Sequence, residues 1–99
     1  MRKNKLEEIV KAKREEILAA ARKHGARKVR VFGSVVRGES GPDSDIDFLV
    51  DLEKGRSLFD HAALYLELEK LLGCKVDVVT EKGLKPRARE RILKEAVNL

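Results

Sequence analysis

The chain has 99 residues, of which 42% are hydrophobic, and its 22 basic and 17 acidic residues give a formal net charge of +5. This length suits a single domain, residues 1–99, because one hydrophobic core usually spans ~100–150 residues. No apolar run approaches the ~20 residues that cross a bilayer, and acidic residues in the N-terminal segment exclude a signal peptide. We therefore expect a single-domain cytoplasmic protein with no membrane segment.

The composition is rich in ion-pairing residues and poor in amides. Charged residues make up 39% of the chain, and glutamine is absent. This pattern is typical of proteins from thermophiles, in which surface ion-pair networks cost less desolvation energy. A basic excess can also indicate nucleic-acid binding, but we favour the ion-pair interpretation and expect no direct contact with nucleic acid. With one cysteine and two histidines, the chain has no disulfide or zinc cluster, so any metal would have oxygen ligands.

Hydrophobic periodicity and turn residues predict seven segments in chain order. They are an amphipathic helix over residues 5–24, a strand over 28–32, a short turn opened by a Gly-Ser pair, a strand over 45–52, a helix over 58–72, a strand over 74–80, and a helix that starts at Pro86 and includes Ala96 and Val97. Ser57 and Asp60 predict the N-cap of the 58–72 helix, and Gly73 predicts its end. The order predicts one α/β (α+β) unit with a sheet of three or more strands.

The acidic residues of the 45–52 strand carry the strongest functional indication. Because side chains alternate between the two faces of a strand, Asp45 and Asp47 point the same way, opposite to its apolar face. Two such carboxylates repel each other unless a cation neutralises them, and Mg²⁺ prefers carboxylates, water and substrate phosphates as ligands. Asp77 is a third carboxylate, in an otherwise valine-rich strand. If the two strands are neighbours, Asp77 completes a Mg²⁺-binding triad.

Gly33 and Ser34 follow the first predicted strand and indicate a phosphate-binding turn. A glycine lets backbone N–H groups approach a phosphate closely, and the serine hydroxyl adds another donor. Arg37 would add a bidentate contact to the same phosphates. An internal ion pair of Arg37 with Asp43 or Glu39 is an equally good interpretation of the sequence.

Two better-known motifs are excluded by single residues. Gly33 and Gly38 match the glycine spacing of a P-loop, but Glu39 stands where the phosphate-binding lysine is required. The alternating aspartates before the second strand mimic the first ligands of an EF-hand. That loop needs glycine at its sixth position and glutamate at its twelfth, where this chain has Phe48 and Lys54.

One stretch joins the glycine turn to the carboxylates, with the sequence GSVVRGESGPDSDIDFLVDL. A Gly-Ser pair, ten residues, an Asp-x-Asp pair and a later Asp resemble the pattern of the DNA polymerase beta-like nucleotidyltransferase superfamily. The chain length and the ending LKPRARERILKEAVNL resemble the minimal nucleotidyltransferases (MNT) of that superfamily. The resemblance covers nearly the whole chain and implies a small mixed sheet flanked by helices.

The resemblance also implies a complete nucleotidyl-transfer site. Gly33 and Ser34 would bind the nucleotide phosphates, and Asp45 and Asp47 would hold two Mg²⁺ ions. Asp77 would be the third metal ligand and the base for the incoming hydroxyl. In a two-metal site of this kind, the ions stabilise the attacking and leaving oxygens while a hydroxyl displaces pyrophosphate from the α-phosphate of a nucleoside triphosphate.

A partner protein is a further implication of the resemblance. MNT proteins resemble the antitoxin half of two-gene modules whose other half is a HEPN-type ribonuclease toxin, and some relatives attach AMP to that toxin. The leading hypothesis is therefore a protein adenylyltransferase that uses ATP. Two alternatives stay open, namely an antitoxin that neutralises its partner by contact alone and a homodimeric adenylyltransferase for a small molecule.

Overall fold

The computed structural model describes residues 5–39, 41 and 44–99. In chain order its elements are α1 (Lys5–Ala12), α2 (Arg14–Lys23), β1 (Ala26–Phe32), α3 (Ser34–Arg37), β2 (Ile46–Leu52), α4 (Leu58–Leu72), β3 (Val76–Thr80), a 3₁₀ turn η1 (Glu81–Gly83), α5 (Pro86–Glu95) and β4 (Val97–Asn98). Within those ranges, no helix is both long and apolar enough to cross a bilayer.

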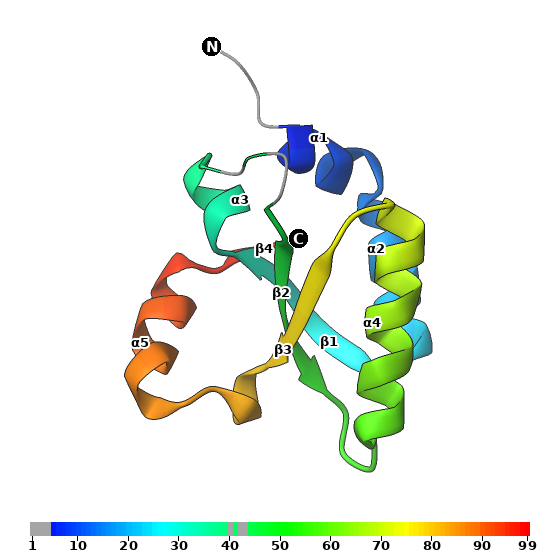
Figure 1. Cartoon of the computed structure of the whole chain (residues 1–99). Helices are drawn as coiled ribbons and strands as arrows, with labels where there is room; N and C mark the ends of the chain where they lie inside the picture. Colours follow the sequence, from blue (N-terminus) through cyan, green and yellow to red (C-terminus); the bar gives the residue numbers. More distant parts are fainter. Residues whose placement is uncertain (1–4, 40, 42–43) are drawn as a thin grey trace.

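The four strands form one mixed sheet in the order β3-β2-β1-β4 (Figure 1). β1 pairs antiparallel with both β2 and β4, whereas β2 and β3 are parallel. Parallel neighbours need a crossover connection, and α4 supplies it. The expected α/β fold with a small mixed sheet flanked by helices is confirmed.

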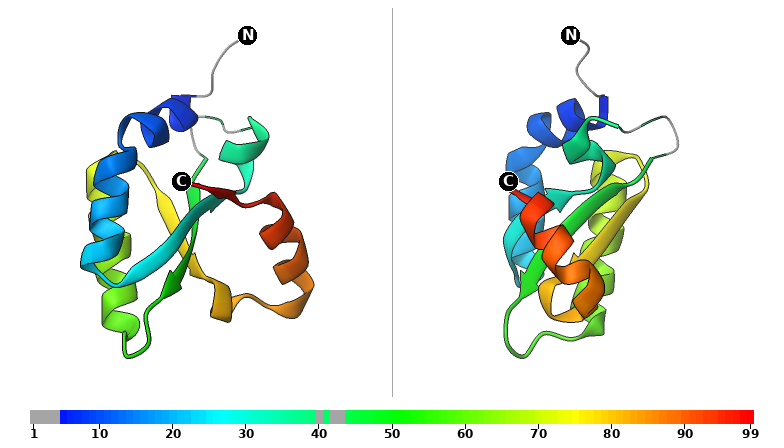
Figure 2. Two further views of the ribbon diagram at one scale, coloured as in Figure 1. Left: turned by 180° about the vertical axis from the view of Figure 1, so that it is seen from behind. Right: turned by 90° about the vertical axis from the view of Figure 1, so that its left-hand side faces the viewer.

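The hydrophobic core lies between the sheet and two of the helices. α2 and α4 cover one face of the sheet and α5 lies on the other side (Figures 1 and 2). The largest fully buried side chains are Ile17, Ile46, Phe48, Leu49, Val50, Leu64 and Leu68, and all of them except Leu49 belong to the cluster beneath these two helices. Because side chains alternate along β2, the apolar residues at 46, 48 and 50 face α2 and α4, which leaves Asp47 on the opposite face.

The predicted single helix over residues 5–24 is two helices. Lys13 separates α1 from α2, with φ −102° and ψ 12°. The apolar pattern explains the break, because the six residues between Val10 and Ile17 include no large hydrophobic side chain. α1 contacts α3, whereas α2 packs on β1 and α4, so the two halves bury their apolar faces against different neighbours.

The end of the chain also differs from its prediction. α5 ends at Glu95, and Ala96 is extended instead of helical. Val97 and Asn98 form β4 and pair with Val31 and Arg30 of β1. A strand of two residues has no periodicity that a sequence pattern could reveal, and its backbone hydrogen bonds to β1 outweigh the weak helical preference of these residues.

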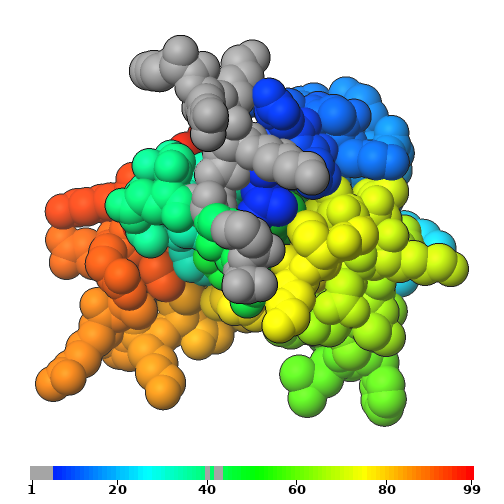
Figure 3. All heavy atoms as spheres, turned by 45° about the horizontal axis from the view of Figure 1, so that its top comes forward, coloured from blue at the N-terminus to red at the C-terminus, as the bar shows by residue number. Residues whose placement is uncertain are grey.

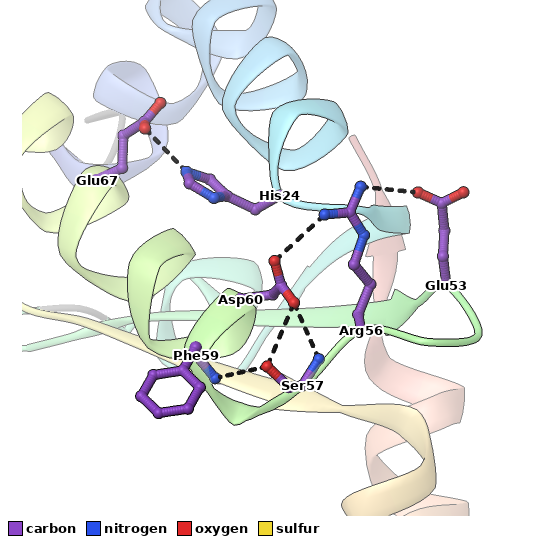
Figure 4. A network of polar contacts seen from close by, with 7 residues as sticks. All are labelled: His24, Glu53, Arg56, Ser57, Phe59, Asp60 and Glu67. Carbon is purple, nitrogen blue, oxygen red and sulfur yellow. Dashed lines mark hydrogen bonds and ion pairs between the residues drawn. The ribbon is translucent and has the colours of Figure 1, made fainter.

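The turn from β2 into α4 is fixed by a capping box (Figure 4). The Ser57 hydroxyl accepts a hydrogen bond from the Phe59 amide at 3.2 Å, and the Asp60 carboxylate accepts one from the Ser57 amide at 2.9 Å. Arg56 adds an ion pair to Asp60 at 3.2 Å and one to Glu53 at 3.8 Å. The N-cap predicted at Ser57 is therefore confirmed, and the start of the crossover helix is held in place.

Candidate active site

Two of the predicted carboxylates come from the parallel strand pair. In the register of β2 and β3, Asp47 lies opposite Asp77. Such partners carry their side chains on the same face of a sheet, so the structure brings Asp47 and Asp77 to one face. Asp45 directly precedes β2 and is exposed like Asp77, whereas Asp47 is half-buried. The expectation that the two acidic strands are neighbours is thereby confirmed.

Asp47 is the electrostatic centre of this group. Its pKa is raised from 3.8 to about 6, first by burial and then by the neighbouring charges of Asp77, Asp45 and Glu95, against an opposing effect of Arg37. The ionised form is therefore disfavoured by both desolvation and like charge. A cation at this point would remove both penalties.

Gly33 brings the end of β1 against Asp47. Its φ of 79° and ψ of −152° belong to a backbone region that is almost restricted to glycine. A Cβ atom built on Gly33 would lie 2.2 Å from Oδ2 of Asp47. The glycine is therefore required both by the backbone conformation and by the close approach of the carboxylate. Ser34 follows as the first residue of α3 and is partly exposed.

Arg37, at the end of α3, is held by two glutamates. Its Nε donates to Oε2 of Glu39 at 2.8 Å, and its Nη1 donates to Oε1 of Glu95 at 2.5 Å. The Gly33 amide donates to the same Oε1 of Glu95 at 2.8 Å. The predicted ion pair of Arg37 with Glu39 is thus confirmed, whereas Asp43 lies outside the described residues. Glu95 is not recognisable from the sequence, because a glutamate in a helix rich in charged residues has no distinguishing pattern.

These elements meet at the end of the sheet where β2 and β3 begin. Figure 3 looks onto that end, and α3, the start of β3 and α5 are all visible on this face. With only four residues, α3 is too short to bind an anion through its helix dipole. Of the predicted phosphate donors, the Gly33 amide and the Arg37 guanidinium are already bonded to glutamates, and the Ser34 hydroxyl lies beside them on α3.

The donor set fits magnesium in chemistry and charge. Asp45, Asp47 and Asp77 offer hard carboxylate oxygens, which are the ligands that Mg²⁺ prefers, and a bound cation would offset the burial and like charge that raise the pKa of Asp47. Among the residues that the structure describes, no three His, Cys, Asp or Glu side chains already converge on one point. The pairing of β2 with β3 brings Asp47 and Asp77 together, whereas a converged set of three metal-binding side chains is absent from the described part of the chain.

A separate cavity of about 330 Å³ lies away from the carboxylates. It is lined mainly by apolar residues of α1, α3, β1 and the end of the chain, among them Val10, Val35, Val97 and Leu99. None of the residues predicted for the active site lines it. The candidate site is therefore an open, charged surface rather than this apolar cavity.

The crossover helix α4 has both a buried and an exposed apolar face. Leu64, Leu68 and Leu72 pack into the core. By contrast, Leu58, Phe59 and Leu66 are 82%, 87% and 61% exposed, and Tyr65 is 36% exposed. The pKa of Tyr65 is raised first by Glu69, with which its hydroxyl forms a hydrogen bond at 3.3 Å, and more weakly by Asp45 and Asp77.

Comparison with known proteins gives a consistent result. The family model described as a nucleotidyltransferase domain matches residues 4–99. Protein adenylyltransferase MntA of Thermococcus cleftensis is 44% identical over 88 residues, which cover 84% of this chain and 89% of the relative. A Methanocaldococcus jannaschii protein, provisionally named a protein adenylyltransferase, is 42% identical over 86 residues, which cover 87% of this chain and 92% of the relative.

Solved structures share the same fold. A structure provisionally described as a minimal nucleotidyltransferase is 56% identical, with a TM-score of 0.86, and the match covers 94% of this chain and 95% of that one. A toxin–antitoxin structure with AMP-PNP has a TM-score of 0.73 at 20% identity, over 85% of this chain and 69% of that one. At that identity the second match shows a common fold only.

Proposed function

The chain belongs to the nucleotidyltransferase domain family, and from this premise we propose that it transfers AMP from ATP to a hydroxyl group of a partner protein. The observation that carries the proposal is the alignment of Asp47 with Asp77 across β2 and β3, beside Gly33. The relatives named protein adenylyltransferase support both the adenylyl group and a protein acceptor.

The carboxylates have different roles in this proposal. Asp45 and Asp47 would hold Mg²⁺, with Asp77 as the third ligand, and the bound ions would offset the negative charge that develops on the reacting phosphates. Asp77 is exposed, so an acceptor hydroxyl can reach it and give up its proton there. The acceptor oxygen then forms a bond to the α-phosphorus, the bond from that phosphorus to the bridging oxygen breaks, and pyrophosphate leaves.

The phosphates of ATP would bind at the turn after β1. The Gly33 amide and the Ser34 hydroxyl donate to phosphate oxygens, and Arg37 makes charge-assisted hydrogen bonds to them. This places the α-phosphate next to Asp47, because the Gly33 backbone and the Asp47 carboxylate are in contact. Positioning and charge neutralisation are most of what phosphoryl-type transfer needs from a protein.

The partner that we propose is a HEPN-type ribonuclease toxin, which the protein would inactivate as its antitoxin. Two observations support a macromolecular acceptor. Asp45 and Asp77 are exposed, so a hydroxyl on a large molecule can approach them. A relative that is 44% identical is named MntA, and solved structures of the same fold are toxin–antitoxin complexes, one of them described as MntA-HpeT.

A contact antitoxin is the second candidate function. The observation in its favour is that Glu95 already bonds to the Gly33 amide and to Arg37, two of the proposed phosphate donors. In that case the acidic site would serve structure or metal binding, and neutralisation of the toxin would survive loss of the carboxylates.

Label transfer from α-³²P-ATP with Mg²⁺ tests the proposal. The protein is incubated with a lysate of its source organism or with a purified HEPN-type partner, next to the Asp45→Ala/Asp47→Ala double variant. The matched control is Asp51→Ala, which removes a carboxylate at the far end of the same strand. We expect a labelled band of toxin size with the wild-type protein and the control, and none with the double variant. Blank lanes with all four nucleotides, or an equal band with the double variant, would reject protein adenylylation.

A further inference from the structure

The carboxylate of Glu95 occupies the anion-binding donors of the candidate site. Its Oε1 atom accepts a hydrogen bond from the Gly33 amide at 2.8 Å and one from Arg37 Nη1 at 2.5 Å. The Glu95 side chain is 18% exposed and that of Arg37 is 45% exposed. One oxygen of a carboxylate therefore stands where the proposed function puts an oxygen of a phosphate.

A carboxylate and a phosphate compete directly for such donors. Both are anionic acceptors that form short, charge-assisted hydrogen bonds to guanidinium and backbone N–H groups. The Gly33 amide has a single hydrogen, which Glu95 already uses. A phosphate can take the Gly33 amide only after the Glu95 carboxylate leaves it.

The position of Glu95 favours replacement of its carboxylate by a phosphate at these donors. It adds a negative charge beside Asp47 and contributes to the raised pKa of that residue, and its hydrogen bonds to Gly33 and Arg37 oppose this like-charge repulsion. Its backbone is fixed, because Glu95 is the last residue of α5 and only Ala96 separates it from β4 on the edge of β1. Release therefore needs a change of side-chain rotamer and no movement of the helix.

We infer that Glu95 is an internal competitor of the nucleotide, which occupies the Gly33 and Arg37 donors until a polyphosphate displaces it. The inference rests on the proposed role of these donors in binding nucleotide phosphates. The apparent affinity for nucleotide is reduced by the fraction of molecules in which Glu95 holds the donors. Glu95 thus sets the nucleotide concentration at which the site fills.

Binding measurements on variants of α5 test this. Glu95→Gln removes the negative charge and weakens the hydrogen bonds to Gly33 and Arg37. Glu95→Asp keeps the charge but shortens the side chain, so that the carboxylate no longer reaches these two donors. Glu90→Gln is the matched control, because Glu90 lies on the same helix and pairs with Lys94, away from the site. The probes are magnesium pyrophosphate and α,β-methylene-ATP, which has no cleavable bond between its α- and β-phosphates, and the dissociation constants are measured by calorimetry.

We expect both Glu95 variants to bind both probes about tenfold more tightly than the wild-type protein, the effect of losing one or two charge-assisted hydrogen bonds to a competitor. Glu90→Gln should stay within about twofold of the wild type. Equal or weaker binding by both Glu95 variants would overturn the inference, because Glu95 would then only position Arg37 or support the fold.

The amide resonance of Gly33 provides a readout that does not depend on affinity. In ¹⁵N–¹H spectra it should move on Glu95→Gln, and it should move in the wild-type protein when pyrophosphate is added. A Gly33 resonance that ignores both changes would also overturn the inference.

The outcome is separable from the proposed function. Tighter pyrophosphate binding by the Glu95 variants without any labelled acceptor would reject the transfer reaction and leave the competition intact. If the acceptor is labelled but the Glu95 variants bind the probes with unchanged affinity, the competition is rejected and the transfer reaction stands.

Discussion

Asp47 and Asp77 are direct partners in the parallel pairing of β2 with β3, so two carboxylates leave the same face of the sheet on adjacent strands. An unneutralised pair of this kind works against folding, because like charges on neighbouring strands repel each other. The half-buried Asp47 takes most of this cost, as its raised pKa shows. Asp47 and Asp77, which would serve the reaction, therefore destabilise the fold when no metal is bound.

Replacing Asp47 with asparagine is expected to stabilise the metal-free protein at neutral pH. Its pKa is about 6 in the folded state against 3.8 ordinarily, so the folded protein keeps a proton that the unfolded chain releases. Stability therefore falls as the pH rises from about 4 to about 6, and above that window ionised Asp47 costs on the order of 1–2 kcal/mol after solvent screening.

Thermal unfolding followed by circular dichroism checks this expectation. The Tm of Asp47→Asn should exceed that of the wild type at about pH 7.5, and the difference should vanish below about pH 3, where the wild-type carboxyl is protonated in both states. A lower Tm for the variant at both pH values would show that the Asp47 carboxylate stabilises the fold instead.

Mg²⁺ is expected to raise the Tm of the wild-type protein at neutral pH, because an ion that binds only the folded state stabilises it. The shift should shrink near pH 5, where most Asp47 is protonated and the metal has to displace a proton. Adding EDTA should reverse it. Asp51→Asn is the control and should keep the shift, and an equal shift in Asp47→Asn/Asp77→Asn would show that the ion binds elsewhere.

Gly33→Ala is expected to cost more than Gly38→Ala, although both glycines have positive φ. A Cβ on Gly38 meets nothing within 4 Å, whereas a Cβ on Gly33 overlaps Oδ2 of Asp47. We expect Gly38→Ala to lose about 1–2 kcal/mol from backbone strain alone. Gly33→Ala should lose more and also bind pyrophosphate less well.

Urea denaturation and calorimetry with pyrophosphate measure the two effects separately. Equal losses of stability in the two glycine variants, with unchanged pyrophosphate binding by Gly33→Ala, would mean that Asp47 can move aside without consequence.

Ser57→Ala is expected to destabilise the protein by about 1 kcal/mol, because it removes the hydroxyl that accepts from the Phe59 amide at the start of α4. Ser57→Asp keeps a capping oxygen and should remain close to the wild type. Chemical denaturation measures both. Equal losses in the two variants would show that the cap contributes little and that packing of Leu64 and Leu68 fixes the helix.

Much of the fold followed from local patterns. Alternation in β2 separates its apolar face from Asp47, and Ser57 and Gly73 mark the two ends of α4, where the structure has a capping box and a left-handed glycine with φ 66°. These features depend on residues close together in the sequence, so the sequence alone could predict them. The resemblance to nucleotidyltransferases rested mainly on the motif in one stretch of chain, together with a later Asp, the chain length and the ending of the sequence, and the family match confirms it.

The features that the sequence did not reveal are tertiary. β4 exists because β1 has an open edge, and α1 and α2 separate at Lys13 because they pack on different partners. Glu95 reaches Gly33 across 62 positions of the sequence. No periodicity or spacing indicates such a contact, so Glu95, the third carboxylate acting on Asp47 besides Asp45 and Asp77, could be found only from the structure.

The length of the three-residue connection between α4 and β3 determines the register of β3 against β2, and with it the position of Asp77 in the candidate site. α4 ends at Leu72 and β3 begins at Val76, and the Ile46 amide donates to the Lys75 carbonyl at 3.1 Å, which fixes where the parallel strands start. A slip of one residue would turn Asp77 toward the apolar core and put a valine opposite Asp47. A substitution in this connection leaves Asp77 opposite Asp47, whereas an insertion or deletion does not. The length of the connection is therefore constrained more strictly than its amino-acid composition.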